Sequence, residues 1–266
     1  MGKLLIANWK SNPETTVKAG KLARAIARET RSAARNVEIV ICPPFVFIES
    51  VSKTLYPIPY TLNPKLGAQD VFWSSGPYTG EVSTRQLKKM GVKYVIVGHS
   101  ERRRYLNEPD EVINRKLKAV LDAGMKAVLC VGEPKRESGI KNYELRIKKA
   151  KAYVRKQLEK DLRGIHNSQF KLHNSLIIAY EPVWAIGTGL ADSPEHAAEM
   201  ARFIKNFLNP KPYTLYPKIL YGGSVTEKNA KRFLSLPEIS GALVGSASLN
   251  AKEFNRIIHI MKNSKR

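Results

Sequence analysis

The sequence predicts a single α/β domain, folded as a closed (β/α)₈ barrel over residues 1–266. Eight short β-rich runs alternate with longer helical segments along the whole chain. No proline-rich or glycine/serine-rich linker interrupts the alternation, and 266 residues suit one large α/β barrel. An open, doubly wound sheet is the alternative. It is less favoured because no G-x-G-x-x-G pattern follows the first run.

The strands are predicted from short runs, most of them rich in β-branched residues, that end near glycine, proline or polar residues. Such continuous apolar runs are typical of parallel strands covered on both faces. Residues 164–174 break the helical pattern before the sixth run, and we expect a polar surface insertion there, at the barrel end opposite the site. In chain order the predicted strands are Lys3–Asn8, Glu38–Cys42, Leu66–Gln69, Tyr94–Gly98, Lys126–Val131, Leu176–Tyr180, Lys218–Tyr221 and Gly241–Val244.

The helices are predicted from amphipathic segments between these runs. Leu22–Ala27 is rich in alanine, a strong helix former, and Ser193 followed by Pro194 is typical of a helix start. Gly91 and Gly124 each lie between a helical segment and a strand, as helix C-terminal caps do. The predicted helical segments are Thr15–Ala34, Phe45–Tyr56, Glu111–Ala123, Asn142–Leu162, Pro194–Leu208 and Ala251–Met261.

The charge of the chain is strongly basic. Lysine plus arginine number 45 against 23 acidic residues, which gives a net charge of +22 and raises the hypothesis of nucleic-acid binding. The basic residues are spread along helical segments such as 141–163, however, and aromatic side chains do not interleave with them as base stacking requires. We therefore favour a solvated basic surface that attracts a small anionic substrate, and we do not expect a nucleic-acid partner.

The cellular setting is predicted from apolar runs and cysteines. No apolar run approaches the ~20 residues that cross a bilayer, and the apolar segment near the start is too short for a signal peptide. Cys42 and Cys130 each lie within a predicted strand. Two buried thiols are favoured over a disulfide, which suits a reducing cytoplasm and no membrane association.

Glu181 is the most informative single residue. It follows the apolar run Leu176–Tyr180 directly, and Pro182 forces the chain to leave the strand just after the carboxylate. The loop that follows carries Trp184, Ile186 and two glycines. Because the carboxyl ends of barrel strands host chemistry in this fold, Glu181 is a candidate catalytic acid or base. A solvated acid at a loop start is the alternative reading.

Other strand ends supply complementary groups. Asn8 and Lys10 follow the first strand, and His99 follows the fourth. Small-residue turns at Gly222–Val225 and Gly245–Ser248 follow the last two strands, where backbone N–H groups can approach a phosphate closely. A base, a hydrogen-bond donor, an ammonium and a phosphate cradle together indicate proton abstraction beside a carbonyl.

The chain resembles the triosephosphate isomerase family over essentially its whole length. Gly98–Arg103 and Ala179–Gly189 are highly specific to that family, and Gly67–Asp70 and Tyr78–Glu81 resemble its long third loop. The resemblance implies a TIM barrel that interconverts dihydroxyacetone phosphate and D-glyceraldehyde 3-phosphate. It also implies a homodimer and neither a metal nor an organic cofactor.

The resemblance also implies roles for individual residues. Glu181 would be the base that moves a proton between C1 and C2 through an enediolate. His99, next to a helix that begins near Ser100, would act as a neutral electrophile. Lys10 would balance the developing oxyanion and the phosphate, and Asn8 would orient the substrate.

Further positions match the family as supporting or phosphate-binding residues. Glu101 and Cys130 fall at supporting positions. The loop 182–189 resembles the closing lid of the family, which excludes water from the site. The positions that match phosphate-binding residues are Gly187, Ser224, Gly245 and Ser246.

The sequence departs from the family pattern in three places. Ser246 stands where a second glycine is usual in the family. Its Cβ restricts the backbone of the turn, so we expect the phosphate affinity to differ from that of the family. Leu190–Asp192 differs from the usual end of the lid. The third loop carries its own composition at Phe72–Pro77, and Thr79 occupies the tip that docks against a partner subunit in the family.

Three alternatives remain open at the level of sequence. The first is a barrel isomerase of another sugar phosphate. The second is a basic nucleic-acid-binding protein that uses the net charge of +22. The third is a catalytically inactive scaffold, which the retained polar groups Lys10, His99 and Glu181 argue against.

Overall fold

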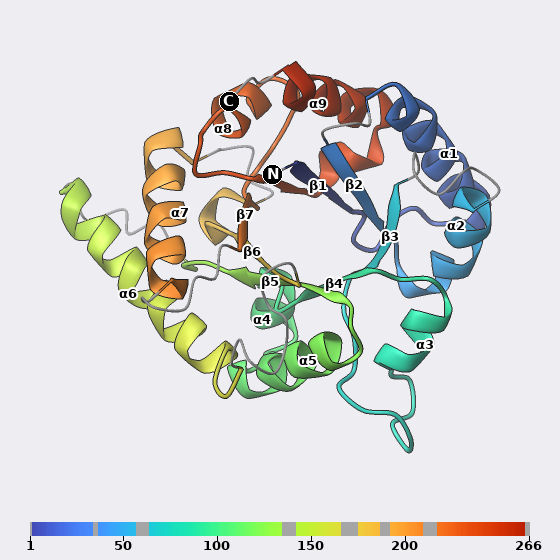
Figure 1. Cartoon of the computed structure of the whole chain (residues 1–266), viewed down its shortest axis with the longest axis horizontal. Helices are drawn as coiled ribbons and strands as arrows, with labels where there is room; N and C mark the ends of the chain where they lie inside the picture. The colour runs from blue at the N-terminus through green and yellow to red at the C-terminus, as the bar shows by residue number, and fades with distance from the viewer. Residues whose placement is uncertain are drawn as a thin grey trace.

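The computed structural model is a closed barrel of eight parallel strands surrounded by helices (Figure 1). It describes residues 2–33, 37–56, 64–134, 142–165, 175–186, 192–209 and 217–263. Neighbouring strands follow chain order, and the ring closes where β1 pairs with β8. The predicted barrel is confirmed. The strands are β1 (Lys3–Asn8), β2 (Val37–Cys42), β3 (Lys65–Ala68), β4 (Tyr94–Val97), β5 (Lys126–Val131), β6 (Leu176–Tyr180), β7 (Lys218–Tyr221) and β8 (Gly241–Val244).

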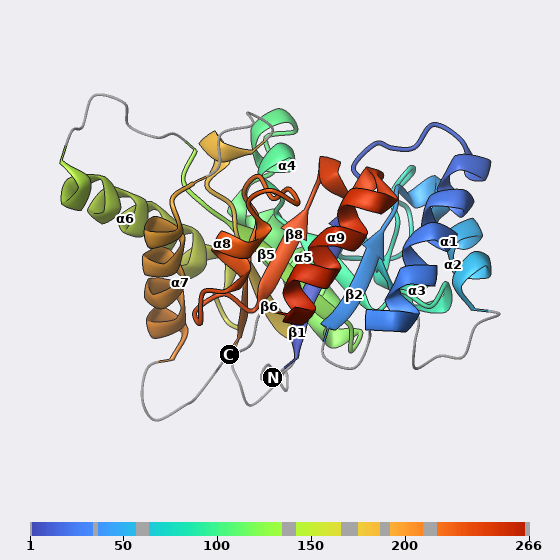
Figure 2. The ribbon, with the colours of Figure 1, turned by 90° about the horizontal axis from the view of Figure 1, so that it is seen from above.

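Helices follow the strands and cover the outside of the barrel (Figures 1 and 2). The α-helices are α1 (Thr16–Ala33), α2 (Ile48–Leu55), α3 (Thr84–Lys89), α4 (Ser100–Tyr105), α5 (Asp110–Asp122), α6 (Tyr143–Asp161), α7 (Pro194–Leu208), α8 (Ala230–Leu234) and α9 (Ala251–Asn263). Short 3₁₀ turns are η1 (Phe45–Phe47), η3 (Val183–Ala185) and η4 (Ser246–Leu249).

Alternation along each strand produces two apolar layers. Residues such as Ile6, Val128 and Leu220 form the core inside the barrel. Their neighbours, such as Leu5 and Leu129, belong to the larger core between strands and helices. Burial on both faces explains why these strands read as continuous apolar runs in the sequence.

Most predicted boundaries agree with the structure to within a residue or two. β3 ends before Gln69, and β4 ends before Gly98, whose φ of +70° takes the chain out of extended geometry. The segment Phe45–Tyr56 divides into η1 and α2. Helices α3 and α8 were not predicted, because six and five residues are too few to show an amphipathic period.

The predicted helix ends are also found. Ser193 caps α7 by accepting a hydrogen bond from the N–H of His196 at 3.1 Å. Gly91 and Gly124 adopt φ values of +86° and +71°, as residues after helix ends do. Most of the predicted surface insertion lies outside the described residues. Among the helices described, none combines the length and apolar character needed to cross a membrane.

Candidate active site

The predicted site residues follow the carboxyl ends of β1, β4 and β6. Asn8 is the last residue of β1, and His99 directly precedes α4. Glu181 is the first residue after β6. Because all strands are parallel, these ends meet at one rim of the barrel. Contacts between side chains, described below, show that residues far apart in the chain come together there.

Glu181 is buried, with 1% of its surface exposed. Its Oε2 accepts a hydrogen bond from the backbone N–H of Ser100 at 2.8 Å. Its Oε1 lies 3.2 Å from Nε2 of His99, yet makes no aligned hydrogen bond within the described part of the chain. One carboxylate oxygen therefore keeps its lone pairs available to accept a proton.

Glycines on both neighbouring strands make room for Glu181. A Cβ built on Gly132, just after β5, would lie 1.7 Å from the carbonyl oxygen of Glu181. A Cβ built on Gly222, just after β7, would lie 2.8 Å from Cγ of Glu181. The backbone N–H of Glu181 donates to the carbonyl of Val131 at 2.8 Å. The backbone and side chain of Glu181 are thus held by close packing on two sides.

The ring of His99 is oriented by its own backbone surroundings. It is the N-cap of α4, and its Nδ1 accepts a hydrogen bond from the backbone N–H of Glu101 at 3.2 Å. A ring nitrogen that accepts a hydrogen bond carries no proton, so the proton of the ring lies on Nε2. Nε2 is the atom that faces Glu181. His99 can therefore present an N–H donor to the site.

Lys10 is positioned by its backbone as well as by its side chain. Its φ of +52° is uncommon for a residue with a Cβ. The backbone N–H of Lys10 donates to Oδ1 of Asn8 at 3.0 Å, and its carbonyl accepts from Nε2 of Gln69 at 2.8 Å. The Lys10 ammonium pairs with Oε1 of Glu101. The ammonium is thus directed along the rim toward the end of β4.

The predicted phosphate-binding positions lie near these groups to different degrees. A Cβ built on Gly245 would lie 3.3 Å from Cε of Lys10, so the turn after β8 passes beside the lysine. Ser246 begins η4 with its side chain exposed, and Ser224 is half-buried in the turn after β7. Gly187 lies outside the described residues.

Cys130, the other supporting residue, lies inside the barrel beneath Glu181. Burial raises the pKa of its thiol, and the charge and hydrogen bond of the Glu181 carboxylate raise it further. Burial likewise raises the pKa of Cys42. Both cysteines are free and buried, which confirms the prediction of thiols in place of a disulfide.

A second carboxylate, Glu133, fixes the start of the loop that follows Glu181. Its two oxygens accept from the hydroxyl of Tyr180, each at 3.0 Å, and Oε1 also accepts from Nε1 of Trp184 at 2.9 Å. The N–H of Val183 donates to the carbonyl of Glu133 at 3.1 Å. The loop therefore leaves β6 in a defined direction.

Behind α4 lies a group of four charged residues that we call the paired cluster. Nζ of Lys116 is 2.8 Å from both carboxylate oxygens of Asp70 and also contacts Oε1 of Glu108. Arg102 reaches Asp70 at 2.9 Å and Glu108 at 3.1 Å. Each of the four has an oppositely charged partner, so the cluster anchors α4 behind the site.

Sequence reasoning missed Gln69, Ser100 and Glu133 as site-supporting residues. Gln69 could have been found by the rule that identified Asn8 and Glu181, because it also follows the end of a strand. Ser100 acts through its backbone N–H, which any residue carries, so no sequence signal marks it. Glu133 contacts Tyr180 and Trp184, which lie 47 and 51 positions further along the chain. A linear sequence pattern does not reveal contacts over such distances.

A rim that combines a buried carboxylate with an unpaired oxygen, a neutral imidazole and an ammonium suits proton transfer beside a carbonyl. On a (β/α)₈ barrel this arrangement defines an isomerase. A sequence model described as triosephosphate isomerase matches residues 3–261. The chain belongs to the triosephosphate isomerase family.

Relatives of this family are similar over nearly their full lengths. The triosephosphate isomerase of Aquifex aeolicus is 41% identical, with 97% of this chain and 99% of the relative covered. That of Picosynechococcus is 39% identical over the same shares of the two chains. That of Thermoanaerobacter pseudethanolicus is 38% identical, with 96% and 98% covered.

Proposed function

We propose that this protein interconverts dihydroxyacetone phosphate and D-glyceraldehyde 3-phosphate, a step of glycolysis and gluconeogenesis, with Glu181 as the catalytic base. Membership of the family supports the reaction. The observation that supports the role of Glu181 is its buried carboxylate, whose Oε1 lies 3.2 Å from the donor nitrogen of His99 without an aligned hydrogen bond.

The proposed reaction moves one proton between adjacent carbons. Glu181 removes a proton from C1 of the ketose, and the C–H electron pair forms the C1–C2 double bond of an enediolate. The carbonyl π electrons move to oxygen, where Nε2–H of His99 and the Lys10 ammonium stabilise the negative charge. The hydroxyl proton on O1 passes to O2, which leaves the negative charge on O1. The electrons on O1 then form the C1 carbonyl while the electrons of the C1–C2 double bond take the proton from Glu181 at C2, which gives the aldose. The step consumes no electrons from outside the substrate, so the proposal includes neither a metal nor a cofactor.

The remaining site residues are assigned to substrate orientation. Asn8 fixes the backbone of Lys10 and lies at the same rim. The turns at Ser224 and at Gly245–Ser246, together with Gly187, are proposed to bind the phosphate through backbone N–H groups. The close approach of Gly245 to Lys10 supports this, because one ammonium can then serve both the phosphate and the reacting oxygen.

We also propose that the protein is a cytoplasmic homodimer. The loop between β3 and α3 projects beyond the ring of helices (Figure 1). It is stiffened by stacking of Phe72 on Trp73, with ring centroids 3.9 Å apart, and it leaves Tyr78 and Thr79 exposed. Thr79→Arg should convert a dimer to monomers in analytical ultracentrifugation, whereas a monomeric wild type would contradict this part of the proposal.

A coupled assay of glyceraldehyde 3-phosphate conversion tests the catalytic assignment. Glu181→Asp withdraws the carboxylate by about one methylene and should lower kcat by on the order of a hundredfold. His99→Gln, which replaces the aromatic N–H donor, should also lower kcat. Unchanged turnover in both variants would falsify the assignment. Faster turnover of another sugar phosphate by the wild type would show that the preferred substrate is that sugar phosphate.

A further inference from the structure

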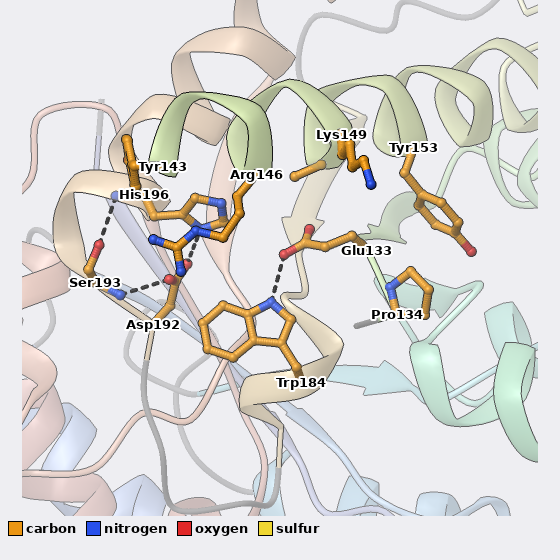
Figure 3. A pocket seen from close by; sticks show the side chains of 11 residues that line it. Glu133, Pro134, Tyr143, Arg146, Lys149, Tyr153, Trp184, Asp192, Ser193 and His196 are labelled. Carbon is orange, nitrogen blue, oxygen red and sulfur yellow. Dashed lines mark hydrogen bonds and ion pairs between the residues drawn. The ribbon is translucent and has the colours of Figure 1, made fainter. Parts of the chain in front are cut away.

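A cavity of about 400 Å³ lies beside the loop that follows Glu181, outside the reaction site. It is enclosed by α6, by the ends of β5 and β6, and by the first turn of α7 (Figure 3). Its size falls in the range of small-molecule sites. The lining residues of interest are Glu133, Tyr143, Arg146, Tyr153, Trp184 and His196.

Flat apolar surfaces make up much of the wall. The rings of Tyr143 and Tyr153 come from α6, and that of Trp184 comes from the opposite side of the cavity (Figure 3). Trp184 is held in place by its hydrogen bond to Glu133 at 2.9 Å. Pro134 and Ala150 complete this apolar part. Such walls suit a planar ring, because rings stack on aromatic faces.

Arg146 supplies a cation with unused hydrogen-bonding capacity. Its Nε is buried, yet has no hydrogen-bond partner among the described residues. Its guanidinium lies 5.8 Å from the ring centroid of Tyr143. Within the described ranges no carboxylate comes within ion-pairing distance of it. A buried guanidinium N–H without an acceptor is costly and is relieved by an anionic ligand.

The two carboxylates of the cavity are already engaged. Glu133 accepts from Tyr180 and Trp184, and burial raises its pKa. Asp192 accepts from the N–H of Ser193 and pairs with Nδ1 of His196, both at 2.7 Å. Burial disfavours a charged His196, but the hydrogen bond and charge of Asp192 outweigh this and raise its pKa. Both carboxylates thus already have partners, while the buried Nε–H of Arg146 lacks an acceptor among the described residues.

We propose that this cavity binds a small molecule that combines one planar ring with one anionic group, either a carboxylate or a phosphate. The ring stacks between Trp184 and the tyrosines, and the anion accepts from Arg146. Trp184 lies three positions after Glu181, so an occupant contacts the segment that carries the proposed base. The cavity is lined by residues of α6 and the start of α7, and these helices lie away from the loop between β3 and α3 (Figure 1).

Isothermal titration calorimetry of the full chain tests the proposal with four probes. Phenyl phosphate and phenylacetate carry both features, benzyl alcohol lacks the anion, and inorganic phosphate lacks the ring. The first two should bind in the cavity with Kd below about 1 mM, and the others should bind there at least about tenfold more weakly. Phosphate bound at the reaction site is distinguished by the Lys10→Met variant described below. If only phenyl phosphate or only phenylacetate binds, the result identifies the anionic group.

Variants assign the binding to the cavity. Arg146→Met should weaken the binding of both ring-bearing anions at least about tenfold. Lys148→Met, which removes a neighbouring positive charge from the same helix, should not weaken it. Tyr153→Ser, at a partly exposed wall position, is a second test that does not depend on the arginine and should also weaken binding. Lys10→Met should leave binding intact, because Lys10 belongs to the reaction site.

Several results would overturn the proposal. Binding that Arg146→Met and Tyr153→Ser leave unchanged would place the ligand elsewhere. Loss of binding in Lys10→Met would assign the binding to the reaction site. If neither ring-bearing anion binds at 10 mM, roughly tenfold above the expected Kd, the cavity is not a site for such ligands. Because the readout is binding and not turnover, failure here leaves the catalytic assignment untouched.

Discussion

The two groups of charged residues on either side of α4 use their charges differently. In the paired cluster, Lys116 and Arg102 each contact both Asp70 and Glu108, and the formal charges sum to zero. At the rim, Glu181 is buried but has no lysine or arginine partner among the described residues. Its neighbours are a neutral imidazole and a backbone N–H. The first arrangement stabilises the fold, whereas the second leaves a group ready to react.

The difference shows how one short helix separates support from chemistry. His99 and Glu101 face the rim, while Arg102 and Arg103 face away from it. Arg103 pairs with Asp110 and Asp161, each at 2.6 Å. Removing a charged group should therefore affect different properties on the two sides of α4. Behind the helix the protein should lose stability, and at the rim it should lose activity.

The largest expected effect is that of Lys116→Met. It leaves Asp70 and Glu108 buried with only Arg102 as partner, and breaking a buried pair in this way costs roughly 3–5 kcal/mol of unfolding free energy. Turnover of the folded variant at low temperature should change little. Urea denaturation measures the first quantity, with Lys118→Met on the same helix as control. A loss below about 1 kcal/mol would mean that the cluster does not stabilise the fold.

Gly222→Ala is expected to act on the rim. The new Cβ would lie 2.8 Å from Cγ of Glu181 and 3.1 Å from the carbonyl oxygen of Tyr180, so Glu181, the proposed base, must move. A displacement of this kind lowers kcat by on the order of a hundredfold. Gly20→Ala in α1, where the added carbon makes only ordinary contacts, is the control. If kcat is unchanged, the position of Glu181 is not set by this glycine.

The smallest effect concerns the pair of Asp192 and His196 and depends on pH. The pKa of His196 is raised in the folded protein from its ordinary 6.5, because Asp192 outweighs burial, with Glu133 and Glu199 adding to it. The wild type should therefore exceed His196→Gln in stability by about 1.5 kcal/mol, typical of a charged hydrogen bond. This advantage is fully present below about pH 6.5 and disappears as pH rises through the raised pKa. Denaturation at several pH values measures it, and an advantage that grows with pH would contradict the assignment.

The sequence predicted the barrel, and it predicted which polar residues lie at its carboxyl rim, because both depend on local patterns. Buried parallel strands appear as apolar runs, and a polar residue directly after such a run lies at the carboxyl rim. Asn8, His99 and Glu181 were found in this way. Cys42 and Cys130 were placed inside the barrel because they lie within the runs themselves.

The features that the sequence did not reveal depend on distant partners or on the backbone. The contact of Lys116 with Asp70 spans 46 positions, and that of Ser100 with Glu181 spans 81. Helices α3 and α8 are too short to show a period. The positive φ of Lys10 has no signature in residue type, because lysine is not a residue that favours it.

The backbone of Lys10 has a consequence for how the protein evolves. A left-handed conformation costs a residue with a Cβ about 1–2 kcal/mol, which glycine would not pay. Selection for heat resistance alone would thus favour glycine at this position, and the ammonium would be lost with the strain. If Lys10 has its proposed role, lysine is retained at this position only while turnover is needed. Its replacement by glycine would then be an early mark of a lineage that no longer uses the activity.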